Sequence, residues 1–130
     1  MNKKLVGISF FLLASTIALG AFGAHALKKW VDANALASFE TGIRYQFYGA
    51  LILLVLAFRP ETMLHRFRFW IRALGLGITL FSGSIYALTL GKMFQLNLNY
   101  FGPVTPIGGA IMILSLIMLG LCFVRNAVQE

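Results

Sequence analysis

The sequence predicts an all-α integral membrane protein, a single domain folded as a four-helix bundle over residues 1–130. Two observations predict this class. Hydrophobic residues make up 59% of the chain and charged residues only 12%, whereas a soluble domain carries about 25% charged residues. Four apolar runs, at about 5–27, 41–58, 73–91 and 107–124, each have close to the ~20 residues that cross the hydrocarbon core of a bilayer as a helix.

Composition also limits the partners and cofactors that we expect. The formal net charge is +7, and the basic residues flank apolar runs, so anionic membrane lipids are expected partners and nucleic acid is not. Cys122 is the single cysteine, which excludes a disulfide within one chain. We find no phosphate-binding loop, no metal-ligand cluster and no nucleophile with a base at a recognisable spacing, so we expect no cofactor, no metal and no enzymatic activity.

The first run has two interpretations. Lys3-Lys4, the apolar stretch and Ala24-His25-Ala26 also fit the three regions of a cleavable signal peptide. The length of the run and the helical spacing of its small residues favour its retention as a membrane span.

The links between the runs carry the polar residues. Residues 28–37 form a polar link that we expect at the interface, and Arg59-Pro60-Glu61 ends the second helix. Thr105-Pro106 predicts the N-cap and first position of the fourth helix. Three arginines in the link before the third helix form a candidate lipid-headgroup collar: Arg66, Arg68 and Arg72.

Orientation follows from the distribution of Lys and Arg around the span ends. The two sets are Lys3, Lys4, Arg59, Arg66, Arg68, Arg72 and Arg125 on one side, and Lys28, Lys29 and Lys92 on the other. Because the cytoplasmic side carries the excess, both termini are predicted to be cytoplasmic.

Small residues recur seven positions apart in the runs, a spacing typical of left-handed helix crossings. They are Ser9, Thr16 and Gly23; Gly42 and Gly49; Gly77, Ser84 and Gly91; and Gly108, Ser115 and Cys122, with Gly20 beside the first set. They predict a compact bundle. The third run also carries a polar stripe (Gly75, Thr79, Ser82, Tyr86 and Thr89). Its side chains either face a water-filled path or bond across helices and to their own carbonyls.

The candidate polar site comprises His25, Glu40, Arg44, Gln46, Ser82 and Tyr86. Glu40 and Arg44 have the order and spacing of a helical ion pair, which either anchors the helix near the headgroups or holds a titrating or cation-binding carboxylate. Gln46 lies between Gly42 and Gly49 and should turn inward, with Tyr86, Ser82 or the backbone beside Gly23 as its partner. His25 is expected to be an interfacial residue or a pH sensor. It cannot share a metal with His65, which lies on the other side.

Four segments together resemble a known family: Gly20-Ala21-Phe22-Gly23-Ala24-His25-Ala26-Leu27, Thr41-Gly42-Ile43-Arg44-Tyr45-Gln46, Phe81-Ser82-Gly83-Ser84-Ile85-Tyr86-Ala87-Leu88 and Thr105-Pro106-Ile107-Gly108-Gly109. The chain resembles the YgdD and YwdK-like family of small bacterial inner-membrane proteins, across nearly its whole length. The resemblance implies four spans with the first one retained, and it brings no activity. Many members carry a His three residues after the Tyr-Gln pair, where this chain has Gly49.

Two functions remain open on the sequence. The first is a non-enzymatic membrane protein that acts through lipid or protein contacts, supporting membrane integrity or a partner complex. The second is a small transporter or channel for ions, protons or a small solute, which would need a homo-oligomer or a membrane-protein partner to provide room for a path. A lipid-modifying enzyme using His25 and Glu40 is a weaker third hypothesis.

Overall fold

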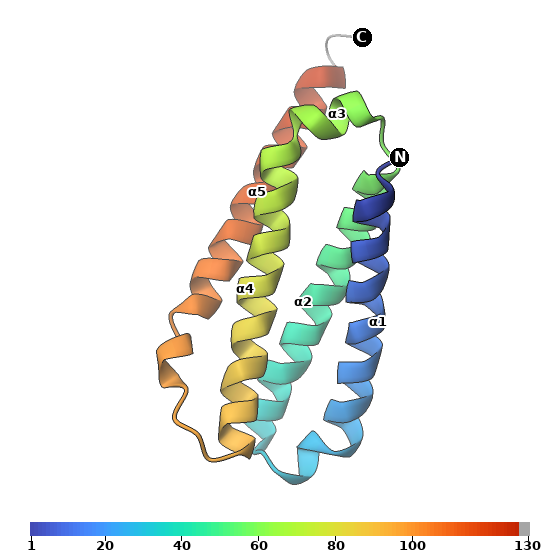
Figure 1. Cartoon of the computed structure of the whole chain (residues 1–130). Coiled ribbons are helices and arrows are strands. Elements are labelled where there is room, and N and C mark those ends of the chain that lie inside the picture. Colours follow the sequence, from blue (N-terminus) through green and yellow to red (C-terminus); the bar gives the residue numbers. More distant parts are fainter. Residues whose placement is uncertain (128–130) are drawn as a thin grey trace.

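The structure is a computed structural model, and it describes residues 1–127. Within these residues the regular elements are helices. Four long helices run side by side, and one short helix crosses one end of the molecule (Figure 1). In chain order they are α1 (Lys3–His25), α2 (Ala33–Ala57), α3 (Glu61–Arg66), α4 (Arg68–Met93) and α5 (Val104–Ala127), with short 3-10 turns at Leu27–Lys29 and Asn99–Phe101. The predicted all-α class is confirmed for these residues.

The long helices form an open row in which each packs mainly on its neighbour. Extensive contacts join α1 to α2, α2 to α4 and α4 to α5, and within residues 1–127 no extensive contact joins α1 to α5. The expected compact bundle is therefore not closed. Lipid tails are as apolar as the side chains they would replace, so a membrane gives little drive to close the row.

Three segments are long and apolar enough to cross a membrane: Lys3–Lys29, Arg68–Met93 and Asn99–Arg125. The chain is thus a helical membrane protein, as predicted. Helix α2 is not among these three, and it carries Glu40, Arg44 and Gln46 in its first 14 residues. Its 25 residues are nevertheless about 37 Å long at 1.5 Å per residue, and four spans remain a prediction.

All four long helices begin before their apolar runs, and α2 and α4 do so by the widest margin. Helix α2 starts at Ala33 instead of residue 41, because the Asp32 carboxylate caps it by accepting a hydrogen bond from the Ala35 N–H at 2.7 Å. The polar link predicted over residues 28–37 is correspondingly shorter. Helix α4 starts at Arg68 instead of residue 73, so Arg68 and Arg72 belong to its first turns and not to a link.

The predicted cap of the last helix is wrong. Helix α5 starts at Val104, one residue before Thr105, and the Thr105 hydroxyl lies 2.7 Å from the hydroxyl of Ser84 in α4. Thr105 therefore joins two helices. Pro106 still lies in the first turn, where the missing N–H removes no helical hydrogen bond.

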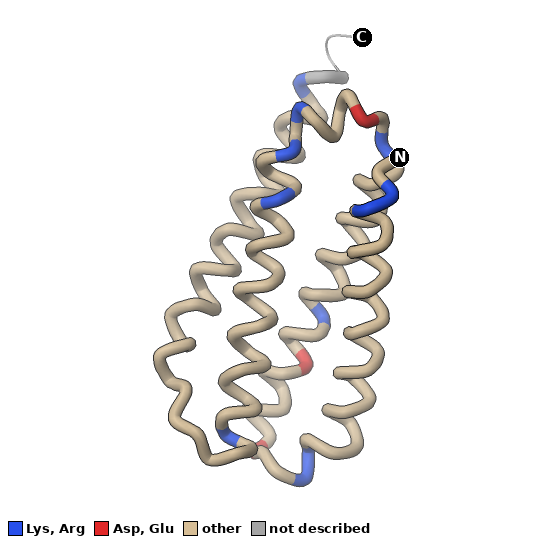
Figure 2. Tube along the Cα trace, viewed as in Figure 1, with Lys and Arg blue, Asp and Glu red and all other residues tan. Residues whose placement is uncertain are grey.

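The two ends of the row differ in charge. Helix α1 begins and α5 ends at the same end of the molecule (Figure 1). Basic residues gather at that end, fewer lie at the other, and one acidic and one basic segment interrupt the middle of the row (Figure 2). The cytoplasmic location of the basic end stays a prediction.

Small residues form the helix contacts. Ser9, Thr16 and Gly23 are the buried residues of α1, as their spacing predicted. Between α4 and α5 the fit is tighter: a Cβ on Gly77 would lie 2.9 Å from the Met112 backbone nitrogen, and one on Gly108 would overlap the backbone of Phe81. Gly20 has open space around it, so not every member of the pattern is used within one chain.

Candidate functional site

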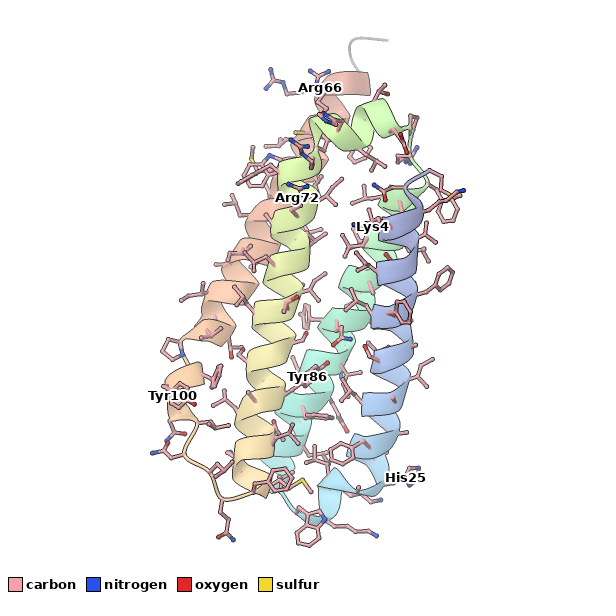
Figure 3. All side chains as sticks on the ribbon, viewed as in Figure 1. Lys4, His25, Arg66, Arg72, Tyr86 and Tyr100 are labelled. Carbon is pink, nitrogen blue, oxygen red and sulfur yellow. The ribbon has the colours of Figure 1, made fainter. Side chains whose placement is uncertain are left out.

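A polar cluster joins α1, α2 and α4 through the side chain of Gln46. This carboxamide is 6% exposed. Its Nε2 donates to the Leu12 carbonyl at 3.1 Å and to the Ser15 hydroxyl at 2.7 Å, and its Oε1 accepts from the Tyr86 hydroxyl at 2.8 Å. Tyr86 reaches from α4 into the space beside α2 (Figure 3). Every hydrogen-bonding group at the end of Gln46 is therefore used within the chain.

Gln46 turns inward because its helix neighbours on that face are small. Gly42 lies against Ile85 and Tyr86, and a Cβ at Gly49 would overlap Ile78. These glycines bring α2 close enough to α4 for the Tyr86 hydroxyl to reach the carboxamide. Tyr86 was among the expected partners, whereas the acceptors on α1 are the Leu12 carbonyl and the Ser15 hydroxyl and not the backbone beside Gly23.

The remaining hydroxyls of the polar stripe bond to backbone carbonyls. Ser82 donates to the Gly42 carbonyl at 2.7 Å and so ties α4 to α2. Thr79 and Thr89 donate to the carbonyls of Gly75 and Ile85, four residues earlier in their own helix. Each of these hydroxyls therefore has a protein partner. A conducting path along the stripe stays a prediction.

Glu40 and Arg44 lie on the opposite face of α2 from Gln46. Both side chains are exposed. Among residues 1–127 the ion pair within 4.0 Å is that of Lys92 and Asp32, at 3.9 Å, so the expected Glu40–Arg44 pair is not formed. A shallow groove of about 300 Å³ runs beside them between α1 and α2, also lined by Gly20, Gly23, Ala24 and Ile43.

Arg44 lies near the middle of α2 and Glu40 nearer its start. Arg44 is the twelfth of 25 residues in α2, about 16 Å from the start of the helix at 1.5 Å per residue. Both residues line a groove with Gly20, Gly23 and Ala24, in the last turns of α1. Neither side chain has an ion-pair partner within residues 1–127.

His25 is the last residue of α1 and is exposed at the end opposite to Arg66 and Arg72 (Figure 3). His65 lies in α3, at the other end of the row. The structure therefore keeps the two histidines apart. Among the residues described, no group of three or more His, Cys, Asp or Glu is arranged to hold a metal ion.

A second groove lies at the basic end, between the start of α1 and the α3–α4 corner. It has a volume of about 240 Å³. Three basic side chains, Lys4, Arg68 and Arg72, line it, and its apolar lining comes from Leu5, Ile8, Leu64 and Ile71, with Asn2 at its edge. Arg66, the third arginine of the expected collar, ends α3 and is exposed outside this groove.

Comparison with known proteins shows the family to which this chain belongs. Residues 19–109, which are 91 of 130, match the family described as "Protein of unknown function (DUF423)". The chain belongs to the DUF423 family. The inner membrane protein YgdD of Escherichia coli is 39% identical over 94 residues, which cover 72% of this chain and 68% of YgdD. The membrane protein YwdK of Bacillus subtilis is 34% identical over 113 residues, covering 84% of this chain and 86% of YwdK.

A membrane protein of Haemophilus influenzae from the same UPF0382 group is 36% identical over 115 residues, covering 88% of this chain and 86% of that protein. No solved structure matches the chain. The DUF423 membership confirms the resemblance drawn from the four motifs. With the apolar helices, it makes the chain a protein of the bacterial inner membrane. None of these three relatives has the name of an enzyme.

The DUF423 match contains the whole Gln46 cluster except the two α1 groups that complete it. Leu12 and Ser15 lie before residue 19. Sequence patterns missed both, because a backbone carbonyl carries no side-chain signal and Ser15 lies off the small-residue stripe. They also missed Lys4 as a neighbour of the arginines, since that proximity depends on how α1 meets α4. A His at position 49 would overlap Ile78 here.

Proposed function

We propose that this DUF423 protein is a non-enzymatic, four-span protein that supports the inner membrane by holding an anionic phospholipid headgroup at its basic end. The observation that carries the proposal is the groove in which Lys4, Arg68 and Arg72 meet above an apolar lining. The two arginines stand one helical turn apart at the start of α4, and Lys4 of α1 lines the same groove.

The lining of this groove suits both parts of a phospholipid, the anionic headgroup and the acyl chain. Arginine forks bind phosphate oxygens in pairs, and lysine adds a compact positive charge. Basic pockets between membrane helices on the cytoplasmic side are typical headgroup sites. Leu5, Ile8 and Leu64 extend the lining with apolar surface suited to the first carbons of an acyl chain.

The Gln46 cluster favours this role over transport. Its donors and acceptor are already satisfied by Leu12, Ser15 and Tyr86, and Ser82 is bonded to Gly42. A solute path through a single chain would have to break these bonds. These bonds argue against a path inside one chain. For the oligomeric transporter, flux equal to that of empty liposomes would reject it.

The test is lipid retention in lipid nanodiscs made of phosphatidylglycerol and phosphatidylcholine. We would compare the wild type with the double variant Arg68→Gln/Arg72→Gln and with the control Lys28→Gln/Lys29→Gln, which loses the same charge at the opposite end. After transfer to detergent, the retained lipid is identified by mass spectrometry.

The wild type and the control should retain phosphatidylglycerol at least about tenfold over phosphatidylcholine, and the arginine variant should lose this preference. Equal retention by the arginine variant would reject the headgroup site. In cells, unchanged membrane permeability and envelope-stress tolerance after deletion of the gene would reject the supporting role.

A further inference from the structure

Helix α2 carries two charged side chains along its length, and neither has a partner in the described chain. Glu40 and Arg44 are exposed, and no side-chain hydrogen bond or ion pair within residues 1–127 includes either of them. All other charged residues described lie near the ends of the row. Figure 2 shows one red and one blue segment on α2, away from the charged segments at the two ends of the row.

The two charges belong to a continuous outward face. On a wheel of 100° per residue, Glu40, Arg44, Phe47 and Leu51 fall within about 60° of one another, opposite the buried Gln46. Phe47, Leu51 and Val55 are 40%, 39% and 61% exposed. The spacing of four, three and four between residues 40, 44, 47 and 51 is that of a seam between two helices that cross with a left-handed twist.

This face is complementary to itself. In a two-fold pair of parallel helices, the residue at position i meets position j of the partner, and j meets i. An acid and a base four residues apart on one face thus form two ion pairs at once, Glu40 with the partner's Arg44 and the reverse. The four charges then sum to zero and are shielded from lipid.

We propose that a second copy of this chain packs on the outward face of α2, and that Glu40 and Arg44 pair across the two-fold axis. The groove of about 300 Å³ beside these residues supplies room for the partner helix. Its α1 wall is made of Gly20, Gly23 and Ala24, and a Cβ added to Gly20 would meet no atom within 4 Å. Small residues of this kind let a further helix approach closely.

The inference is independent of the headgroup site, because that groove lies at the other end of the membrane-spanning row and involves α1, α3 and α4. Loss of lipid retention would leave the pairing untouched, and a monomeric chain could still bind lipid. The two proposals therefore fail separately.

A charge-swap experiment in lipid vesicles tests the pairing. The chain is expressed with two different affinity tags, and sequential purification measures the fraction that carries both. Wild type should give a mixed dimer. Glu40→Arg alone and Arg44→Glu alone should each lower the mixed fraction by at least tenfold, because four like charges then meet.

Co-expression of Glu40→Arg with Arg44→Glu should restore the mixed dimer, since each remaining contact again joins an acid to a base. A pair formed within one chain cannot produce this result, because each variant chain then holds charges of one sign. Single variants that associate as well as the wild type would overturn the proposal, as would a wild type that never carries both tags.

A crosslinking measurement keeps the test valid if a swapped variant does not fold. In a Cys122→Ser background, Leu51→Cys should form a disulfide-linked dimer under mild oxidation. The control Leu121→Cys is exposed on α5 at a similar distance along its helix and should stay monomeric. No crosslink at Leu51→Cys, or equal crosslinking at both positions, would overturn the proposal.

Discussion

The two faces of α2 differ in whether their polar side chains are bonded within the chain. On the inward face, the Gln46 carboxamide is buried and bonded to groups of α1 and α4. On the outward face, Glu40 and Arg44 are exposed and have no partner within residues 1–127. The polar groups of Gln46 are bonded within a single copy of the chain, whereas the charged groups of the other face find no partner in that copy.

The difference shows how polar groups in a span divide between folding and association. A group whose donors and acceptors are all used holds its own helices together, and its removal should weaken the fold. A charge left toward lipid raises the cost of the isolated chain and favours any partner of opposite charge. Substitutions on each face separate these two outcomes when stability is measured by SDS-driven unfolding in mixed micelles.

Gly49→Leu should give the largest effect on the inward face. Its Cβ would overlap Ile78, so we expect a loss of about 3 kcal/mol in the free energy of unfolding, at the upper end for overpacking. Ala37→Leu enlarges a side chain on the exposed face and should alter the unfolding free energy of the monomer by less than about 0.5 kcal/mol. Equal effects would contradict the assignment of the two faces.

Gln46→Leu should destabilise the chain by about 1–2 kcal/mol, because the Tyr86 and Ser15 hydroxyls lose their partner. Arg44→Leu is the matched control on the outward face. It should leave the unfolding free energy of the monomer unchanged or raise it, because it removes an unpartnered charge. A control that destabilises more than Gln46→Leu would reverse the comparison.

Tyr86→Phe should cost about 0.6 kcal/mol, the average for a hydrogen bond between membrane helices. Combined with Gln46→Leu, it should add almost nothing, since both changes remove the same bond. A double-mutant cycle measures this coupling. Fully additive losses would show that the 2.8 Å contact between the two side chains does not stabilise the fold.

The smallest effect is expected for Lys92→Ala. Its ion pair with Asp32 spans 3.9 Å between well-exposed side chains, so its loss should cost less than about 0.5 kcal/mol. Asp32→Ala should cost about 1 kcal/mol, because it also removes the cap on Ala35. Equal losses from the two variants would assign the stabilisation to the ion pair and not to the cap.

Periodicity within one helix could be predicted well from the sequence. The inward turn of Gln46 followed from its flanking glycines, and the burial of Ser9, Thr16 and Gly23 followed from their spacing. Helix starts were less accurate, because α2 extends beyond its apolar run to a cap at Asp32. The relation between helices could not be predicted: no single-helix pattern indicates that Ser15 bonds to Gln46 or that Lys4 and Arg72 line one groove.

Two errors matter most for the site. The Glu40–Arg44 spacing predicted an ion pair within α2, but two side chains four residues apart on a helix remain free to point outward without meeting. The small-residue stripes predicted a compact bundle, but they specify only pairwise contacts and not closure of the row. The first error concerns the choice of side-chain rotamers within α2, and the second concerns how separate helices are arranged.

Native mass spectrometry of the wild-type chain, released directly from lipid particles, tests the central claim about α2 most directly. The account predicts a species with the mass of two chains, which falls to one chain in Arg44→Glu. A wild type that appears as one chain at every protein-to-lipid ratio would contradict it.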